Sequence, residues 1–122
     1  MMAWRFAGRS ESRIDDVVLE SARRWSIETA ARYNRLIFAA LEAIGDSPAL
    51  PGYRPVPGVE GVRALHLRYA RRLVPQEHQV REPRHLVLYR LAADGAVEVL
   101  GLVHDRQLLD RAARRAQREA NG

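Results

Sequence analysis

The first half of the chain carries two consecutive stretches of helical periodicity. In the first, apolar or small side chains recur every three or four positions, at Ile14, Val17, Val18, Ser21, Ala22 and Trp25. The second keeps the same spacing at Ala30, Tyr33, Ile37, Phe38, Leu41 and Ile44. Because a helix turns about every 3.6 residues, this spacing places apolar residues on one face. The pattern predicts two amphipathic helices with almost no linker, forming an antiparallel hairpin over about residues 11–45.

Polar residues and helix breakers indicate where these helices begin and end. Ser12 opens a Ser-x-x-acid pattern and Ser26 precedes the second apolar stripe, so each serine oxygen is expected to accept a free backbone N–H of a first turn. Gly45, followed by Pro48, predicts the end of the second helix. Before the first helix, the segment "AWRF" (residues 3–6) is a possible short strand.

The middle of the chain changes to an alternating pattern after a loop rich in proline and glycine, "DSPALPGYRPVPGVEG". In the following segment "VRALHLRY", Leu65 and Leu67 are expected on one side of a strand, with Ala64, His66 and Arg68 on the other. The next predicted strand, "RHLVLYRL", comes after a polar, charged insertion at residues 70–83. The loop itself is expected to lack regular structure.

The end of the chain predicts a hairpin of strands and then a helix. Asp94-Gly95 is a strong turn signal between "RHLVLYRL" and "VEVLGLVH". A narrow stripe of leucine and alanine on an arginine-rich background predicts a basic helix over about 106–119. That helix is marginal alone in water and must pack on its own sheet or on a partner. The expected fold is α+β: a helical hairpin packed on an antiparallel sheet over about 62–104, with a short C-terminal helix.

Composition places the chain among ordinary globular proteins. Its 122 residues fit a single domain, 1–122, and 47% hydrophobic with 29% charged residues argue against general disorder. The absence of cysteine excludes a disulfide scaffold, thiol catalysis and thiolate zinc sites. No apolar run approaches about 20 residues, and the first residues lack the apolar core of a signal peptide. A cytoplasmic protein without a membrane segment is therefore expected.

The charge is basic and unevenly spread. All 20 basic side chains are arginine, and without lysine a Walker A phosphate loop is excluded. Of the net charge of +5, residues 54–90 contribute +5 (eight Arg, three Glu) and residues 106–122 contribute +3 (five Arg, two acids), while the rest is slightly acidic. The second half therefore presents a cationic surface suited to an acidic protein or to nucleic acid.

His104, Asp105 and Arg106 form a polar group at the end of the last predicted strand. Adjacent strand side chains point to opposite faces, so His104 and Asp105 are not expected to converge on one reacting atom. No Ser or Thr follows Ser47, which leaves a hydrolytic triad without a nucleophile. Asp105 is instead expected to cap the terminal helix, stabilising it by about 1 kcal/mol. The four histidines lack the i, i+4 spacing of a helical metal site, so neither metal nor cofactor is expected.

The arginines of the predicted strands are the strongest candidates for binding. Arg63, Arg68, Arg90 and Arg106 lie on or at the ends of the three strands. The plain alternative is a solvated charged face. On the open side of one sheet, however, they would form a fixed array of planar donors able to grip carboxylates or phosphates with paired hydrogen bonds.

The order of these motifs resembles the ParE branch of the ParE/RelE toxin superfamily. The resemblance is carried by "ALEAIGDSPAL", "GVRALHLR", "RHLVLYRL" and "VEVLGLVHDRQLL" over roughly residues 3–111, and its most specific pieces are "RHLVLYR" and "VLGLVHDR". The insertion at 70–83 is longer than in compact members, and the tail after Arg111 is less typical. The resemblance implies a small α+β protein that is the toxin of a bacterial type II toxin–antitoxin pair.

ParE-type toxins trap DNA gyrase on cleaved DNA and have no known catalytic centre. A ParD-like antitoxin neutralises them by wrapping a disordered, often acidic tail around the toxin. The resemblance therefore implies a toxin that is not an enzyme, with a ParD-like antitoxin and gyrase as partners. The residues expected to bind antitoxin or target are Arg63, Arg68, Arg90, His104 and Arg106.

The RelE branch supplies the alternative, a ribosome-dependent mRNA endonuclease that uses basic side chains of the sheet and a C-terminal tyrosine. By that resemblance Arg63, His85 and Arg106 would stand at catalytic positions. No aromatic residue follows Tyr89, so the tyrosine role is vacant. Loss of one positioned acid–base group costs about 10²–10⁴ in rate, which favours gyrase poisoning. Simple nucleic-acid binding by the arginine surface is a third, disfavoured hypothesis.

Overall fold

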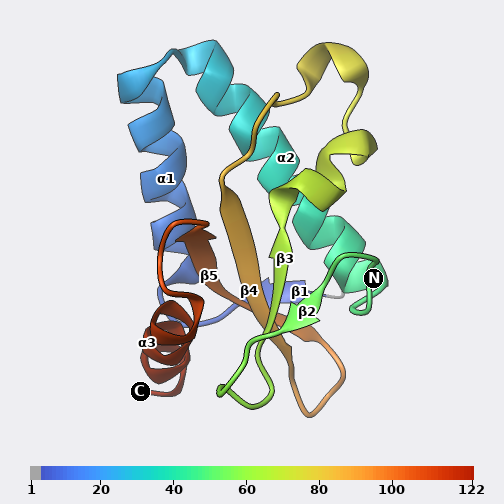
Figure 1. Cartoon of the computed structure of the whole chain (residues 1–122), viewed down its shortest axis with the longest axis vertical. Coiled ribbons are helices and arrows are strands. Elements are labelled where there is room, and N and C mark those ends of the chain that lie inside the picture. The colour runs from blue at the N-terminus through green and yellow to red at the C-terminus, as the bar shows by residue number, and fades with distance from the viewer. Residues whose placement is uncertain (1–3) are drawn as a thin grey trace.

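The computed structural model describes residues 4–122 and has an α+β architecture, as predicted (Figure 1). Its elements in chain order are β1 (Trp4–Phe6), α1 (Ser10–Arg24), α2 (Ile27–Asp46), β2 (Arg54–Pro55), β3 (Arg63–His66), the 3₁₀ helices η1 (Leu67–Leu73) and η2 (Gln76–His78), β4 (His85–Leu91), β5 (Val97–His104) and α3 (Leu109–Asn121). The predicted strand "AWRF" is present as β1, with Ala3 outside the described residues.

The five strands form one mixed sheet in the order β1-β5-β4-β3-β2. Strand β1 runs parallel to β5, and the other neighbouring pairs are antiparallel. The sheet is therefore larger than the three antiparallel strands that the alternating pattern predicted. The extra parallel strand precedes the helical hairpin, and no tight turn joins it to its neighbour.

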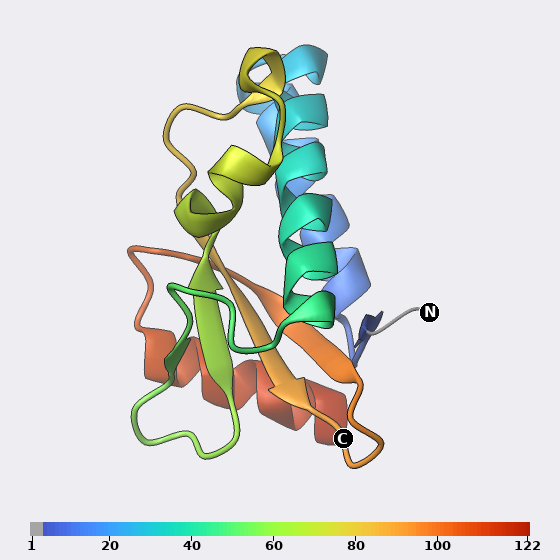
Figure 2. The same cartoon turned by 90° about the vertical axis from the view of Figure 1, so that its right-hand side faces the viewer.

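Each face of the sheet packs against a different helical layer. Along β4, Val87 and Tyr89 belong to the core shared with α1 and α2, whereas Leu86 and Leu88 belong to a second core shared with α3. Figures 1 and 2 show α1 and α2 side by side above α3, which crosses the lower part of the sheet. The expectation of an open sheet face is therefore wrong along this part, because α3 covers it.

Helix α1 begins earlier and buries less than its pattern predicted. It starts at Ser10 after the N-cap residue Arg9, which makes no side-chain cap, so the predicted cap by Ser12 is wrong. Ser10 Oγ instead accepts a hydrogen bond from the backbone N–H of Ala7 at 3.2 Å. Trp25 was expected in the apolar stripe, but it is 74% exposed because the helix ends at Arg24 and the chain turns there.

Helix α2 follows its prediction closely. Ser26 caps it, accepting a hydrogen bond from the backbone N–H of Thr29 at 3.0 Å. The helix ends at Asp46, one residue beyond the predicted Gly45. Its buried side chains are Ala30, Tyr33, Leu36, Ile37, Ala40, Leu41 and Ile44, so it forms the centre of the hairpin core.

Strand β3 is shorter than the alternating pattern predicted. It ends at His66, whose Nδ1 accepts a hydrogen bond from the backbone N–H of Arg68 at 3.1 Å and so stabilises the first turn of η1. Arg68 therefore lies on a 3₁₀ helix and not on a strand, which corrects the prediction. The insertion at 70–83 is partly ordered, because Ala70 and Val74 are buried against the hairpin core.

The predicted β-hairpin of β4 and β5 is present. The backbone N–H of Ala92 donates to the carbonyl oxygen of Ala96 at 2.8 Å, and the Asp94 side chain accepts from the N–H of Ala96 at 3.1 Å. Gly95 takes a φ of +87°, which glycine adopts readily because it has no Cβ. The turn sets the register as far as Tyr89, and a bulge between Leu88 and Tyr89 then shifts it by one residue, which brings His85 opposite His104.

The C-terminal helix docks on its own sheet, one of the two outcomes left open by the sequence. Ala112 and Ala113 are buried, and Ala116 packs beside them against the second core. The helix begins at Leu109, later than the predicted residue 106, and its first turn has no side-chain cap. The predicted cap by Asp105 is therefore wrong, because that residue lies outside the first turn.

No helix within residues 4–122 combines the length and the hydrophobicity needed to cross a bilayer.

Candidate functional site: an arginine-lined groove

Two of the predicted binding arginines are held apart from each other. Arg63 donates from Nη1 to the carbonyl oxygen of Pro48, just beyond α2, at 3.2 Å. Arg90 donates from Nε to Glu98 at 2.9 Å and from Nη1 to Asn121 of α3 at 2.8 Å. Arg63 therefore points to the α2 side of the sheet and Arg90 to the α3 side. The expectation that all the sheet arginines share one face is wrong, since strand side chains alternate.

Arg68 and Arg106, by contrast, are brought to one cleft. Its volume is about 470 Å³. Its lining residues are Gly52, Arg54, Ala64, His66, Arg68, Tyr69, Arg84, Leu86, Asp105 and Arg106. Four arginines thus surround a small apolar floor of Ala64 and Leu86, at the end of the sheet where β4 begins and β5 ends.

A second cleft adjoins the first and is equally basic. Its volume is about 500 Å³, and its lining is Pro51, Gly52, Arg68, Tyr69, Arg71, Arg72 and Gln79. Gly52, Arg68 and Tyr69 line both clefts and form the wall between them. We call the two clefts together the arginine groove, with Arg54, Arg68, Arg71, Arg72, Arg84 and Arg106 as its groove arginines.

The charges of the groove are almost entirely positive. Among the described residues, Arg84 alone of the groove arginines has a carboxylate partner, Asp105, at 3.1 Å. Asp105 is also the one acidic residue in either lining. Five guanidinium groups are therefore available to an anionic ligand, and each presents a planar set of donors.

Asp105 has a structural role between the groove and the sheet. Its Oδ2 lies 3.2 Å from His66 Nε2, and its Oδ1 accepts from Arg84 Nε at 3.2 Å. His66 Nδ1 already accepts a backbone N–H, so Nε2 carries the proton and donates to Asp105. Burial acts to raise the pKa of Asp105, but the hydrogen bond from His66 and the charge of Arg84 outweigh it and lower that pKa.

The wall between the clefts is a stack of three residues. Gly52 packs so closely on Tyr69 that a Cβ at this position would lie 2.4 Å from the ring. The guanidinium of Arg68 lies 4.9 Å from the centre of the same ring, and its Nη2 is 3.4 Å from the hydroxyl oxygen. Stacking on the ring restricts the position of the Arg68 guanidinium. The Tyr69 side chain remains partly exposed. The groove thus has a fixed aromatic and cationic ridge at its middle.

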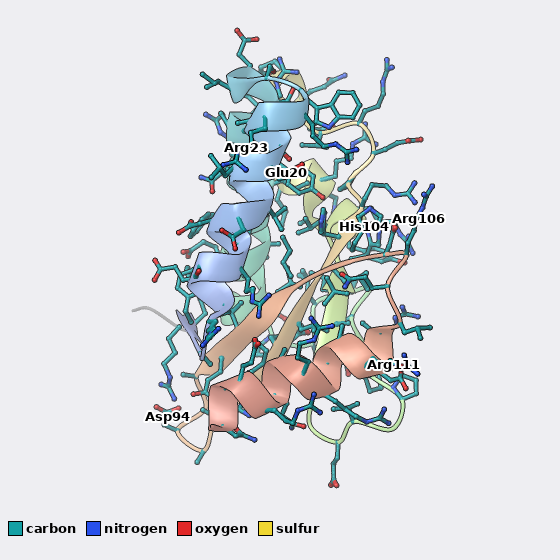
Figure 3. The ribbon with its side chains drawn as sticks, turned by 90° about the vertical axis from the view of Figure 1, so that its left-hand side faces the viewer. Glu20, Arg23, Asp94, His104, Arg106 and Arg111 are labelled. Atoms are coloured by element: carbon teal, nitrogen blue, oxygen red, sulfur yellow. The ribbon has the colours of Figure 1, made fainter. Side chains whose placement is uncertain are left out.

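His104 and His85 lie beside the groove and do not line it. Their rings are 5.1 Å apart, and His85 Nδ1 accepts a hydrogen bond from the hydroxyl of Tyr33. Burial, followed by the charge of His104, lowers the pKa of His85 to about 4. Burial also raises the pKa of Tyr33 to about 12. His104 Nδ1 accepts the backbone N–H of Arg106 at 3.1 Å and so helps to position that residue (Figure 3).

The variant His85→Asn is expected to reduce the acid sensitivity of the fold. Between about pH 6.5 and 4, an unfolded chain binds a proton at His85 that the folded chain does not, so the free energy of unfolding falls as pH falls. Allowing for partial exposure, the loss at pH 4.5 is about 1–2 kcal/mol. Urea unfolding at pH 7 and 4.5 measures it. His78→Asn, on η2, should keep the native pH dependence; equal behaviour of the two variants would contradict this assignment.

The residues that would serve RelE-type cleavage are not assembled. On β4 the partner of Arg63 is Tyr89, four positions along the strand from His85. At about 3.3 Å per residue, this separation is about 13 Å. Arg106 lies in the groove near His104, whereas His85 is a neutral, half-buried neighbour of Tyr33. These three positions therefore share no site into which one phosphodiester could fit.

Sequence reasoning missed part of the groove. The sequence pattern did not identify four of the groove arginines, Arg54, Arg71, Arg72 and Arg84, as candidates for binding. Their common location arises from pairing over long range, since β2 sets Arg54 opposite Ala64. The signal available in the sequence was the Tyr69 that precedes the two insertion arginines, an aromatic residue within a basic run.

Within residues 4–122, no group of three His, Cys, Asp or Glu side chains is arranged to hold a metal ion.

Comparison with known proteins supports the resemblance given by the motifs. No family model matches the chain. The chain is 29% identical over 104 residues to a protein named Toxin ParE1 from Caulobacter vibrioides, and the match covers 85% of this chain and 90% of that protein. The resemblance to ParE toxins is therefore confirmed over nearly the whole length of the chain.

Proposed function

We propose that this chain is the toxin of a type II toxin–antitoxin module, that it poisons DNA gyrase in the cytoplasm, and that a ParD-like antitoxin neutralises it. The observation that carries the proposal is the match to Toxin ParE1, which extends over 90% of that protein. The match spans 104 residues, which is 85% of this chain. Function is therefore proposed for the whole fold and not for one short motif.

The chemistry of the groove supports binding over bond cleavage. No Ser or Thr occurs after Ser47, and the positions of a RelE-type centre, Arg63, His85 and Arg106, are separated. Five groove arginines have no carboxylate partner among the described residues. Such groups form strong charge-assisted hydrogen bonds with an acidic partner. An acidic antitoxin segment that meets these donors at Arg68 and Arg106 would also need apolar contacts outside the groove, because the groove itself has few apolar side chains.

A gyrase cleavage assay tests the proposed target. Purified protein added to gyrase and supercoiled plasmid is expected to yield linear, enzyme-linked DNA. The double variant Arg68→Ala/Arg106→Ala should need at least about 100 times more protein for the same yield, since each of the two lost charge-assisted hydrogen bonds contributes about 1.5–3 kcal/mol. The readout is the protein concentration that linearises half of the plasmid.

A matched control variant distinguishes the loss of contacts in the groove from the general loss of positive charge. Arg23→Ala/Arg118→Ala removes the same charge from exposed positions on α1 and at the far end of α3, and it should behave like the native protein. In Figure 3, Arg23 projects from α1, away from Arg106. A clean supercoiling reaction at large excess of native protein would overturn the gyrase target. If both double variants need the same increase in protein concentration, gyrase poisoning does not depend on the groove.

A further inference from the structure

We propose that the arginine groove binds a single strand of nucleic acid, with the phosphodiester backbone on the groove arginines and a base stacked at the ridge of Arg68 and Tyr69. This inference goes beyond the proposed toxin function and does not depend on it. From the sequence, direct nucleic-acid binding is the disfavoured hypothesis. The arginine groove favours such binding, because folding gathers six arginines around two adjoining clefts.

The first argument is the arrangement of charge. The groove arginines come from β2, η1, the segment before β4 and the turn after β5, so folding has collected them from distant parts of the chain. Arginine binds phosphate through two parallel N–H donors, and five of the six lack a carboxylate partner among residues 4–122. Two adjoining clefts can each receive a phosphate of one strand.

The second argument is the ridge at the middle of the groove. Proteins that bind single strands combine a cationic groove with aromatic faces, on which bases stack without regard to sequence. Arg68 lies over the ring of Tyr69, and Gly52 fixes that ring from close contact. A guanidinium plane held in this way is itself a stacking surface for a base. The ridge therefore supplies the second element that single-strand binding requires.

The size and lining of the clefts favour one strand over two other polyanions. At about 470 and 500 Å³, each cleft has the size of a small-molecule pocket and is too small for a duplex. An acidic peptide that orders on binding needs apolar anchors to offset its lost entropy. Apart from the Tyr69 ring, the groove offers only Pro51 and the buried side chains of Ala64 and Leu86 for that purpose. Phosphates and bases need no such anchors.

Fluorescence anisotropy with the full chain tests the inference without gyrase or antitoxin. The probe is a labelled DNA strand of about 12 nucleotides, within the site sizes of about 4–16 known for single-strand modules. If about three phosphates are neutralised, affinity should fall about 20-fold between 50 and 200 mM salt. Competition by the same strand as a duplex, and by a polyglutamate peptide of equal charge, gives the relative preference.

Two variants test whether the strand binds in the groove. Arg68→Ala/Arg106→Ala is expected to lower affinity about tenfold or more and to make the salt dependence shallower, because fewer counterions are released. Tyr69→Ala should lower affinity about 5–100-fold, the range for loss of one stacked base. Arg23→Ala/Arg118→Ala should bind like the native chain. Circular dichroism of each variant checks that the fold is retained, and Arg106→Ala alone serves if the double variant unfolds.

Several outcomes would overturn the inference. If Arg68→Ala/Arg106→Ala and Arg23→Ala/Arg118→Ala lose the same affinity for the strand, the attraction is an unspecific one to a basic protein. Tighter competition by polyglutamate than by the strand would assign the groove to an acidic peptide, and tighter binding of the duplex would exclude a single-strand site. Because no gyrase is present, a negative result here leaves the gyrase assay unaffected, and the reverse also holds.

Discussion

Gly52→Ala is expected to lower the free energy of unfolding by about 2–6 kcal/mol, a large effect for one added methyl group. Gly52 has a φ of +102°, and a Cβ there would lie 2.4 Å from the Tyr69 ring. Backbone strain accounts for about 1–3 kcal/mol. Overpacking against the ring accounts for about as much again. Relief requires the ring to move, and Arg68 moves with it, so the groove should also lose affinity for its ligand.

Gly61→Ala is the matched control for this prediction. Gly61 also has a positive φ, +82°, but no atom lies within 4 Å of a Cβ at that position. Gly61→Ala should therefore lower the free energy of unfolding by the backbone strain alone, about 1–3 kcal/mol, with no change in ligand binding. Urea unfolding and ligand affinity, measured for both variants, separate the two contributions. If Gly52→Ala and Gly61→Ala lose the same free energy of unfolding and the same ligand affinity, the close packing of Gly52 on Tyr69 does not shape the groove.

Ile37→Ala is expected to cost about 2–5 kcal/mol of unfolding free energy. Ile37 is fully buried on α2, in the core between the hairpin and the sheet, so its removal leaves a cavity as well as lost apolar burial. Ile27→Ala makes the same substitution on the same helix, at a side chain that is 82% exposed. That variant should change stability by less than about 0.5 kcal/mol.

Urea unfolding of both isoleucine variants gives the comparison directly. The midpoint should fall strongly for Ile37→Ala with an unchanged dependence on denaturant, since the surface exposed on unfolding is nearly the same. A similar loss in Ile27→Ala would mean that Ile27 is covered in solution, for example by a second molecule. A small loss in Ile37→Ala would contradict its place in the core.

Local patterns in the sequence predicted much of the fold, because the interactions that decide it are local. The cap at Ser26 and the stripe of α2 lie within one helix, and the Asp94-Gly95 turn sets its own hairpin. The failures occurred where local signals compete. Ser12 and Asp105 are both residues that favour caps, yet α1 begins at Ser10 and α3 at Leu109, so neither residue occupies the N-cap position.

The site was less predictable than the fold, because it depends on contacts between distant segments. Alternation placed Arg68 on a strand, but the His66 side chain turns the backbone into a 3₁₀ helix just before it. Arg63 and Arg90 were correctly placed on strands, yet they point to opposite faces and bind Pro48 and Glu98. Which arginines meet was decided by strand order and by the docking of α3, neither of which has a local signature.

Strand β5 has a consequence for how the protein is made. It bonds to β1 on one side and to β4 on the other, so Trp4–Phe6 pairs with Val97–Val99, a segment that is synthesised much later. Until residues 97–104 leave the ribosome, the sheet cannot close and Arg106 has no fixed position. A chain that ends before Arg106, whether nascent or prematurely terminated, thus lacks the groove, and any toxicity that depends on the groove begins only after this residue is made.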